Sequence, residues 1–214
     1  NQKDLGVMSL DIGYGITSMS VFEENKLMHV AAFPVGAGNI TNDLAIGLKS
    51  SIDVAERLKM AYGHAIAREI PSRAMIDLQK IDSTLHGQVS RRFIIEIIEA
   101  RLAEMLDFVN CELKTIHRAG SLPSGVVISG GCAKMPGLVD LVKRELKLPA
   151  QIGVPDTSSF EINDPSVEEK LSDPEFSAVV GLVLWNRDTK EGVARGSGFG
   201  KFNALRRFIR LFIP

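Results

Sequence analysis

Apolar and polar side chains alternate in three runs over the first forty residues, which predicts three β-strands. The runs are GVMSLDIG, TSMSVFEE and KLMHVAAFPVG. A tight turn at Glu24-Asn25-Lys26 separates the second run from the third, and the short connections favour antiparallel pairing. We therefore expect the chain to open with a three-stranded meander.

Farther along, apolar positions recur every three or four residues, the spacing of helices with one buried face. We expect one short helix at 41–48 and another that runs from Ser51 as N-cap to Gly63 as C-cap. A single apolar stripe predicts a long helix from Ser90 to about Ala119. Its members are Ile94, Ile98, Leu102, Met105, Val109, Leu113 and Ile116.

The second half continues to alternate strands and helices. Residues 73–81 have the pattern of a strand, and the apolar, β-branched run at 124–131 predicts a buried strand that ends in two glycines. A helix with Pro136 near its start should follow, and PAQIGVP predicts one more strand. A last buried helix is expected at 173–186, before the glycine-rich segment GVARGSGFG.

Composition places the chain among ordinary soluble proteins. Its 214 residues are 45% hydrophobic and 24% charged, enough for a real core, and the net charge of −1 gives no reason to expect nucleic acid as a partner. Cys111 and Cys132 are expected to be buried thiols in a reducing compartment. Because the chain has neither a signal-peptide pattern nor an apolar run of about 18 residues, we expect a cytoplasmic protein.

The stretch LDIGYGIT combines chemistry with a sharp turn. Asp11 ends an apolar run, Gly13 and Gly15 follow, and Thr17 begins the next run. Clustered backbone amides at glycines can bind phosphate, and a carboxylate beside them can hold a divalent cation through water. A plain hairpin, whose glycines supply only positive φ, explains the same pattern.

Ser129-Gly130-Gly131 repeats the theme at the end of a later strand, where a ligand could again approach the backbone. An ordinary turn from strand to helix is the alternative. Between the two glycine turns, Glu56 and Lys59 lie one helical turn apart. They could hold a ribose, but on the residues alone we favour a surface ion pair.

The order of these segments resembles the second half of the FtsA family of bacterial cell-division proteins, in the superfamily of actin and the heat-shock chaperone ATPases. The resemblance covers residues 5–186 and rests on LDIGYGIT, FPVGAGNITNDLAIGL, AERLKMAYG, RRFIIEIIEARLAEML, GVVISGGCAKMPGL, QIGVP and DPEFSAVVGLVL. It implies an α/β, actin-like (ribonuclease H-like) ATPase fold, of which this chain holds only the second lobe. That lobe would contain a mixed five-stranded sheet, flanking helices and a small inserted α+β subdomain.

The resemblance also implies a division of the chain. Residues 1–43 and 93–186 would form subdomain IIA, which binds nucleotide, and 44–92 the inserted subdomain IIB. Residues 187–200 would be a flexible linker, and 201–214 an amphipathic membrane-targeting helix.

ATP and Mg²⁺ are the ligands that the resemblance implies. The nucleotide-binding positions would be Gly13, Gly15, Thr17, Glu56, Lys59, Gly130 and Gly131. Asp11 would hold Mg²⁺ through water and is the one possible catalytic group. The pattern departs from the family at Tyr14, Ile16 and Ala37, where glycine, threonine and glycine are usual. Because the other lobe is missing, we expect at most a weak ATPase and an inactive half-cleft in this chain alone.

Two protein partners follow from the resemblance: the C-terminal peptide of the tubulin-like protein FtsZ, and further copies of the chain in an actin-like filament. IIB and the start of the long helix would receive the peptide, with Arg91, Arg92 and Arg101 as anchors. Solvated charges on a helix face are the alternative.

The last fourteen residues, KFNALRRFIRLFIP, form two faces when drawn as a helix. One face carries Phe202, Leu205, Phe208, Ile209 and Phe212, and the other carries Arg206, Arg207 and Arg210. Such a helix is too short to span a bilayer but suits the interface of an anionic membrane. The alternative is a terminal helix that packs on its own domain.

These observations favour an adaptor that binds ATP, polymerises and tethers FtsZ filaments to the cytoplasmic face of the cell membrane at the division site. A protein of the related PilM type, which serves pilus assembly, is one alternative. A sugar kinase or chaperone-type ATPase of the same superfamily is another, although we find no catalytic base for it besides Asp11.

Overall fold

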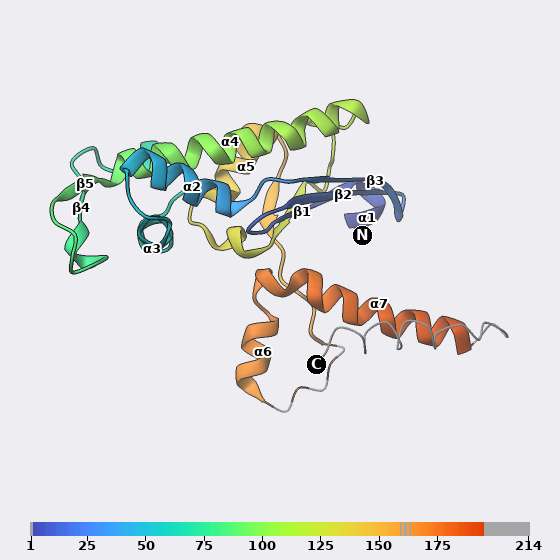
Figure 1. Cartoon of the computed structure of the whole chain (residues 1–214). Coiled ribbons are helices and arrows are strands. Elements are labelled where there is room, and N and C mark those ends of the chain that lie inside the picture. Colours follow the sequence, from blue (N-terminus) through green and yellow to red (C-terminus); the bar gives the residue numbers. More distant parts are fainter. Residues whose placement is uncertain (1, 159, 161, 163, 195–214) are drawn as a thin grey trace. The chain divides into compact units, whose positions relative to one another are not determined.

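The computed structural model describes the chain except for residues 1, 159, 161, 163 and 195–214 (Figure 1). The chain forms two compact units, Asn1–Ser177 and Ala178–Pro214. In the second unit the described residues belong to one helix, α7 (Ser177–Ala194), so the features below are those of the first unit.

The first unit is built on a mixed five-stranded sheet in the order β3-β2-β1-β6-β7. The strands are β1 (Val7–Ile12), β2 (Thr17–Glu23), β3 (Lys26–Phe33), β6 (Val126–Ser129) and β7 (Ala150–Ile152). The first three strands pair antiparallel, whereas β6 is parallel to both β1 and β7. Glu24 and Asn25 turn the second hairpin with φ of 51° and 59°, so the meander and the mixed sheet are both confirmed.

The other elements of the first unit are helices, short 3₁₀ turns and a second small sheet. The helices are α1 (Gln2–Leu5), α2 (Ala37–Leu48), α3 (Ile52–Tyr62), α4 (Arg91–Thr115), α5 (Leu138–Leu146) and α6 (Pro165–Leu171). The 3₁₀ turns are η1 (Ala67–Glu69), η2 (Leu78–Lys80), η3 (Gly131–Lys134) and η4 (Pro174–Phe176), and β4 (Met75–Asp77) pairs with β5 (Gln88–Ser90).

The long helix α4 lies along one face of the five-stranded sheet (Figure 1). Its expected stripe is buried from Ile94 to Leu113, and the rings of Phe33 in β3 and Phe108 in α4 stack with centroids 6.0 Å apart. The helix ends at Thr115, earlier than predicted, because His117 adopts a left-handed φ of 56°.

One hydrophobic core continues from the sheet into the region predicted as IIB. Met8 and Leu10 of β1 and Ile66 and Ile76 of the inserted region belong to the same buried cluster. The strand predicted at 73–81 is confined to β4, because the Asp77 side chain accepts a hydrogen bond from the Gln79 amide and begins a 3₁₀ turn there.

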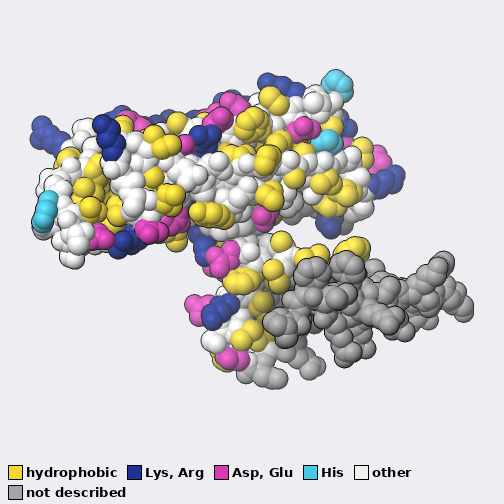
Figure 2. Space-filling view, in the orientation of Figure 1, with side chains coloured by type: hydrophobic (Ala, Val, Ile, Leu, Met, Phe, Trp, Pro, Cys, Tyr) yellow, Lys and Arg dark blue, Asp and Glu magenta, His cyan; other side chains and the backbone are white. Residues whose placement is uncertain are grey.

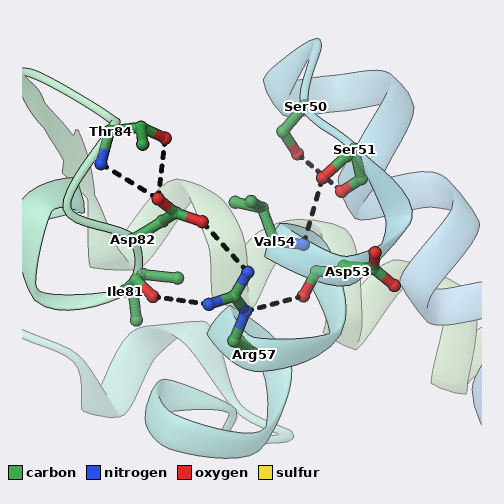
Figure 3. Close-up of polar contacts among 8 residues, drawn as sticks. All are labelled: Ser50, Ser51, Asp53, Val54, Arg57, Ile81, Asp82 and Thr84. Carbon is green, nitrogen blue, oxygen red and sulfur yellow. Dashed lines mark hydrogen bonds and ion pairs between the residues drawn. The ribbon is translucent and has the colours of Figure 1, made fainter.

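Arg57 fastens the loop after β4 to α3 (Figure 3). Its guanidinium donates to the Ile81 carbonyl at 2.9 Å and to the Asp82 carboxylate at 3.1 Å. Hydrogen bonds from Thr84, and then from Arg57, hold the pKa of Asp82 below its ordinary value. In the same view Ser51 accepts from the Val54 amide at 3.3 Å, which confirms the predicted N-cap.

Two expectations need correction. Both cysteines are free, but only Cys132 is buried, because Cys111 lies on α4 between stripe positions and faces solvent. Helix α7 continues through residues 187–194 of the predicted linker, and Gly192 does not end it. The rest of that linker and the tail lie outside the described residues. Over the described part of the chain, no helix combines the length and apolarity needed to cross a bilayer.

Candidate functional site

The two glycine turns meet at one edge of the sheet. Strands β1 and β6 are parallel neighbours, with Asp11 opposite Ser129, so both turns leave the sheet at its carboxyl end. The Ser129 hydroxyl donates to the Asp11 carboxylate at 3.0 Å. Parallel strands bring together turns that are 118 residues apart in sequence, at the place where ligands usually bind in such sheets.

A pocket of about 240 Å³ opens beside these turns. Its lining residues are Gly13, Tyr14, Ala37, Glu56, Lys59, Met60, Gly63, Gly131, Cys132, Lys134, Met135, Pro136 and Glu175. Four predicted positions therefore share one pocket: Gly13, Glu56, Lys59 and Gly131. Because sites that enclose a whole ligand measure roughly 300–1,000 Å³, this pocket fits one part of a ligand.

Lys59 forms the buried polar wall of the pocket. Its side chain is only 5% exposed, and its ammonium lies 2.8 Å from Glu56 Oε2, 2.8 Å from Thr41 Oγ1 and 3.1 Å from the Ala37 carbonyl. The Thr41 hydroxyl also donates to Glu56. Glu56 and Lys59 thus form the expected ion pair one helical turn apart, but Lys59 is buried, so the pair is not a plain surface contact.

The same network sets the charge of Glu56. Partial burial raises the pKa of its carboxyl, but hydrogen bonds from Lys59 and Thr41 outweigh burial and hold the pKa below its ordinary value. The pocket thus contains a fixed carboxylate and a fixed ammonium side by side, a pair that can accept from and donate to hydroxyl groups.

The turn between β1 and β2 is bound to the first turn of α2. The Ala37 amide donates to the Gly13 carbonyl at 2.9 Å, and the Gly38 amide donates to the Tyr14 carbonyl at 2.7 Å. A Cβ at Gly36 would lie 2.5 Å from the Tyr14 oxygen, so only glycine permits this approach. These bonds start α2 at Ala37, four residues before the predicted helix.

Two amides remain available at the tip of that turn. The Gly13 amide closes the hairpin on the Ile16 carbonyl at 2.9 Å. No described residue accepts a hydrogen bond from the amide of Tyr14 or of Gly15. A Cβ at Gly15 would meet no atom within 4 Å, so the tip is open to an anion.

Gly130 and Gly131 have different roles. Gly130 has a φ of 84°, and a Cβ there would lie 2.5 Å from the Ile12 carbonyl oxygen, so the junction of β6 with β1 requires glycine. At Gly131 a Cβ would meet nothing within 4 Å, although this residue lines the pocket. Gly131 therefore leaves space for a ligand, whereas Gly130 serves the fold.

Asp11 and Thr17 lie beneath the pocket and are not among its lining residues. The Thr17 hydroxyl is buried and donates to the Val35 carbonyl at 2.8 Å, so its proton is engaged within the fold. Asp11 is partly exposed, and its second oxygen lies on the side of Gly13. A single carboxylate suits Mg²⁺ that phosphates and water hold, and the described residues offer no cluster of three metal-binding side chains.

The three arginines expected to bind a peptide differ in the hydrogen bonds that they already form within the chain. Arg91 donates to the Tyr62 carbonyl at 3.3 Å, and Arg92 pairs with Glu96 one turn along α4 at 3.2 Å. Arg101 donates two hydrogen bonds to Asp43 and one to Glu104. Arg101 is thus committed to contacts within the chain.

The sequence interpretation missed the opposite wall of the pocket. Lys134 lies 2.6 Å from Glu175 and 3.0 Å from Asp173, and the Gly130 amide donates to the Pro174 carbonyl at 3.0 Å. Lys134 stands close to the glycine pair in the sequence and could have been found there. Glu175 is 41 residues from Lys134, and no local pattern marks it.

A family model described as cell division protein FtsA matches residues 8–181. The chain belongs to the FtsA family. It is 29% identical to FtsA of Pseudomonas aeruginosa over 185 residues, which are 86% of this chain and 43% of that protein. It is 32% identical to FtsA of Rhizobium meliloti over 219 residues, 99% of this chain and 48% of that protein. The chain thus spans about half the length of these relatives.

Solved structures of actin-like proteins share the fold. MreB5 of Spiroplasma citri bound to ADP superposes with a TM-score of 0.67 at 17% identity, over 92% of this chain and 58% of that chain. A PilM–PilN type IV pilus biogenesis complex gives a TM-score of 0.59 at 22% identity, over 86% of this chain and 46% of that chain. The family match favours FtsA over the PilM, kinase and chaperone alternatives.

Proposed function

We propose that this chain is the nucleotide-binding second lobe of an FtsA-type adaptor, which binds ATP with Mg²⁺, polymerises, and links FtsZ filaments to the cytoplasmic face of the membrane at the division site. One observation carries the proposal. The β1–β2 turn, the Glu56–Lys59 pair and Gly131 line a single pocket at the carboxyl edge of the sheet.

In this proposal each part of the pocket has its own task. The amides of Tyr14 and Gly15 donate to phosphate oxygens, and the Glu56 carboxylate with the Lys59 ammonium binds ribose hydroxyls. Gly131 leaves room for the base. Asp11 would hold Mg²⁺ through water, and the ion would supply positive charge beside the phosphates. Because Asp11 already accepts from Ser129, we expect hydrolysis by the chain alone to be weak at most.

Calorimetric titration with ATP, with and without Mg²⁺, tests nucleotide binding. Asp11→Asn should reduce the effect of Mg²⁺ on affinity while retaining a partner for the Ser129 hydroxyl. Thr157→Ala, a change at a partly exposed position outside the pocket, serves as the control. The absence of heat at ligand concentrations up to the millimolar range, in a chain that is folded by circular dichroism, would contradict the proposal.

The start of α4 offers a surface for the FtsZ peptide. Arg91 and Arg92 stand beside Phe93, which is 43% exposed, and Met75, which is 52% exposed, lies opposite Ser90 in the β4–β5 pair. Figure 2 shows hydrophobic side chains gathered over the end of the unit that α2, α3 and the small sheet form, with basic side chains at its border. Such a mixture suits an acidic, apolar peptide.

Charge reversal tests this surface. Arg92→Glu should weaken the binding of an FtsZ C-terminal peptide, measured by fluorescence anisotropy. Lys114→Glu, at the opposite end of the same helix and exposed, is the matched control. Equal loss in both variants would indicate a general charge effect, and no loss in either would place the peptide elsewhere.

Membrane attachment rests on the sequence of the tail alone, since residues 201–214 lie outside the described structure. Burial of the apolar face and attraction of Arg206, Arg207 and Arg210 to anionic lipid, at roughly 1 kcal/mol per basic residue, would act together. Phe208→Glu should abolish flotation with anionic liposomes, whereas Phe208→Leu should retain it. Equal flotation with neutral liposomes would contradict the electrostatic part.

Self-assembly is the remaining part of the proposal. Actin-like filaments would place many tails on one membrane surface, and such multivalency multiplies weak individual binding. Light scattering and electron microscopy with ATP and Mg²⁺ test it in the longer protein that contains both lobes. A protein that binds ATP but stays monomeric at all concentrations would contradict this part alone.

A further inference from the structure

The ring of Tyr14 covers the Lys59 ammonium on the pocket side. The ring centroid lies 5.7 Å from Lys59 Nζ, within the range of a cation–π contact. Both residues line the pocket. The three N–H groups of Lys59 already face Ala37, Thr41 and Glu56, so the Tyr14 ring interacts with the positive charge of the ammonium and not with a free N–H group.

The backbone of Tyr14 is fixed, while its side chain has freedom. The Tyr14 carbonyl accepts from the Gly38 amide at 2.7 Å, so the backbone cannot leave α2 without breaking that bond. The residue as a whole is 65% exposed, and no described residue forms a hydrogen bond with its phenol group. Rotation of the ring about its Cα–Cβ bond therefore sacrifices only the contact with Lys59 and the packing described next.

Gly38 leaves the space that the Tyr14 ring occupies. A Cβ on Gly38 would lie 2.9 Å from both Cε1 and Cζ of Tyr14. The ring thus lies against the first turn of α2 because residue 38 has no side chain.

We propose that Tyr14 is a gate that sets the affinity of the pocket: its ring shields Lys59 in the empty site, and a nucleotide that carries phosphate enters by turning the ring toward solvent. The inference rests on the proposed nucleotide binding. Phosphate then approaches the free amides of Tyr14 and Gly15, and the ribose reaches the Glu56–Lys59 pair, whose ammonium the ring no longer covers.

Two substitutions separate the ring from the hydroxyl. Tyr14→Ala removes the gate and should tighten the binding of Mg·ATP about two- to fivefold, the equivalent of about 0.5–1 kcal/mol for an exposed cation–π contact. Tyr14→Phe keeps the ring and should bind as the wild type does. Urea unfolding of all three proteins checks that their stability is similar.

A second measurement follows the ring itself. The chain has two tyrosines, so Tyr62→Phe leaves Tyr14 as the only one, and 3-fluorotyrosine labelling of that variant gives a single ¹⁹F resonance. Mg·ATP should shift this resonance toward the position of a solvated tyrosine.

The outcomes distinguish the gate from the nucleotide site. Equal affinity of wild type and Tyr14→Ala, or weaker binding by Tyr14→Ala, would overturn the gate and leave nucleotide binding intact. A bound nucleotide that leaves the ¹⁹F resonance unchanged would also overturn the gate. If neither wild type nor Tyr14→Ala binds Mg·ATP, both the gate and the proposed nucleotide site are wrong.

Discussion

Arg101 on α4 donates two parallel hydrogen bonds to Asp43 on α2, from Nε to Oδ2 at 2.5 Å and from Nη2 to Oδ1 at 2.9 Å. The hydrogen bonds that Arg101 donates to Asp43 hold the pKa of the guanidinium above its ordinary value. Helix α2 also carries Ala37 and Thr41, which position Lys59. The Arg101–Asp43 pair therefore stabilises the helix that positions Lys59, although neither residue lines the pocket.

Loss of this pair should reduce stability. Arg101→Met keeps the aliphatic stem but removes both hydrogen bonds to Asp43 and the one to Glu104. We expect the free energy of unfolding to fall by only about 1–2 kcal/mol, because a quarter of the Arg101 and Asp43 side chains remains solvated. Arg92→Met, whose partner Glu96 is half exposed, should change stability by less than about 0.5 kcal/mol. Urea unfolding measures both. Equal effects would show that the bidentate pair adds nothing specific.

The two glycines after β6 should respond in opposite ways to a side chain. Gly131→Leu should block the pocket and weaken nucleotide binding at least tenfold with little loss of stability, since a Cβ there meets no atom. Gly130→Ala should instead lower the free energy of unfolding by about 2 kcal/mol or more, because it combines a positive φ with a clash against Ile12. Calorimetry and urea unfolding separate the two effects. A Gly131→Leu chain that binds ATP normally would place the ligand elsewhere.

The Glu56 network predicts a loss of stability in acid. The pKa of Glu56 in the folded chain lies below its ordinary value of 4.5, so the stabilisation is fully present above pH 4.5 and is lost as the pH falls through the folded pKa. Glu56→Gln lacks this titration. The difference in urea midpoint between wild type and Glu56→Gln should therefore shrink between about pH 6 and pH 3. A difference that stays constant over this range would contradict the prediction.

The two cysteines should differ sharply in reactivity. Burial raises the pKa of the Cys132 thiol to about 11, so at about pH 8 only about one molecule in a thousand carries the thiolate, and the sulfur is shielded as well. Cys111 is exposed. Iodoacetamide should modify one thiol per folded chain and two in urea, as mass spectrometry will show. Cys111→Ser should abolish labelling of the folded chain, and rapid labelling of that variant would contradict the burial of Cys132.

Local features could be predicted from sequence because neighbouring residues determine them. The meander follows from alternation, the N-cap of α3 from Ser51, and the face of α4 from a stripe with helical period. The strand predicted at 73–81 is longer than β4, because the pattern of apolar residues does not show that Asp77 caps a 3₁₀ turn. Helix α2 begins early because its first amides bind carbonyls of a turn more than twenty residues away.

The site was only partly predictable, since its chemistry depends on contacts between distant segments. The spacing of Glu56 and Lys59 indicated a pair but not its burial, which requires Thr41 and Ala37. Likewise, Arg101 could not be assigned to Asp43 from a separation of 58 residues. The glycine pair at the end of β6 was found, but only the geometry shows that Gly130 and Gly131 do different things.

The parallel pairing of β1 with β6 has a consequence for how the chain is made. Ribosomes add about 5–20 residues per second, so the edge of β1 stays unpaired for roughly 6 to 23 seconds until β6, its parallel neighbour, has been synthesised. During that interval the meander of β1, β2 and β3 presents an unpaired edge and an apolar face. Nascent chains that stall before residue 126 should therefore associate with one another or with chaperones, and the pocket cannot exist on the ribosome until its last strand arrives.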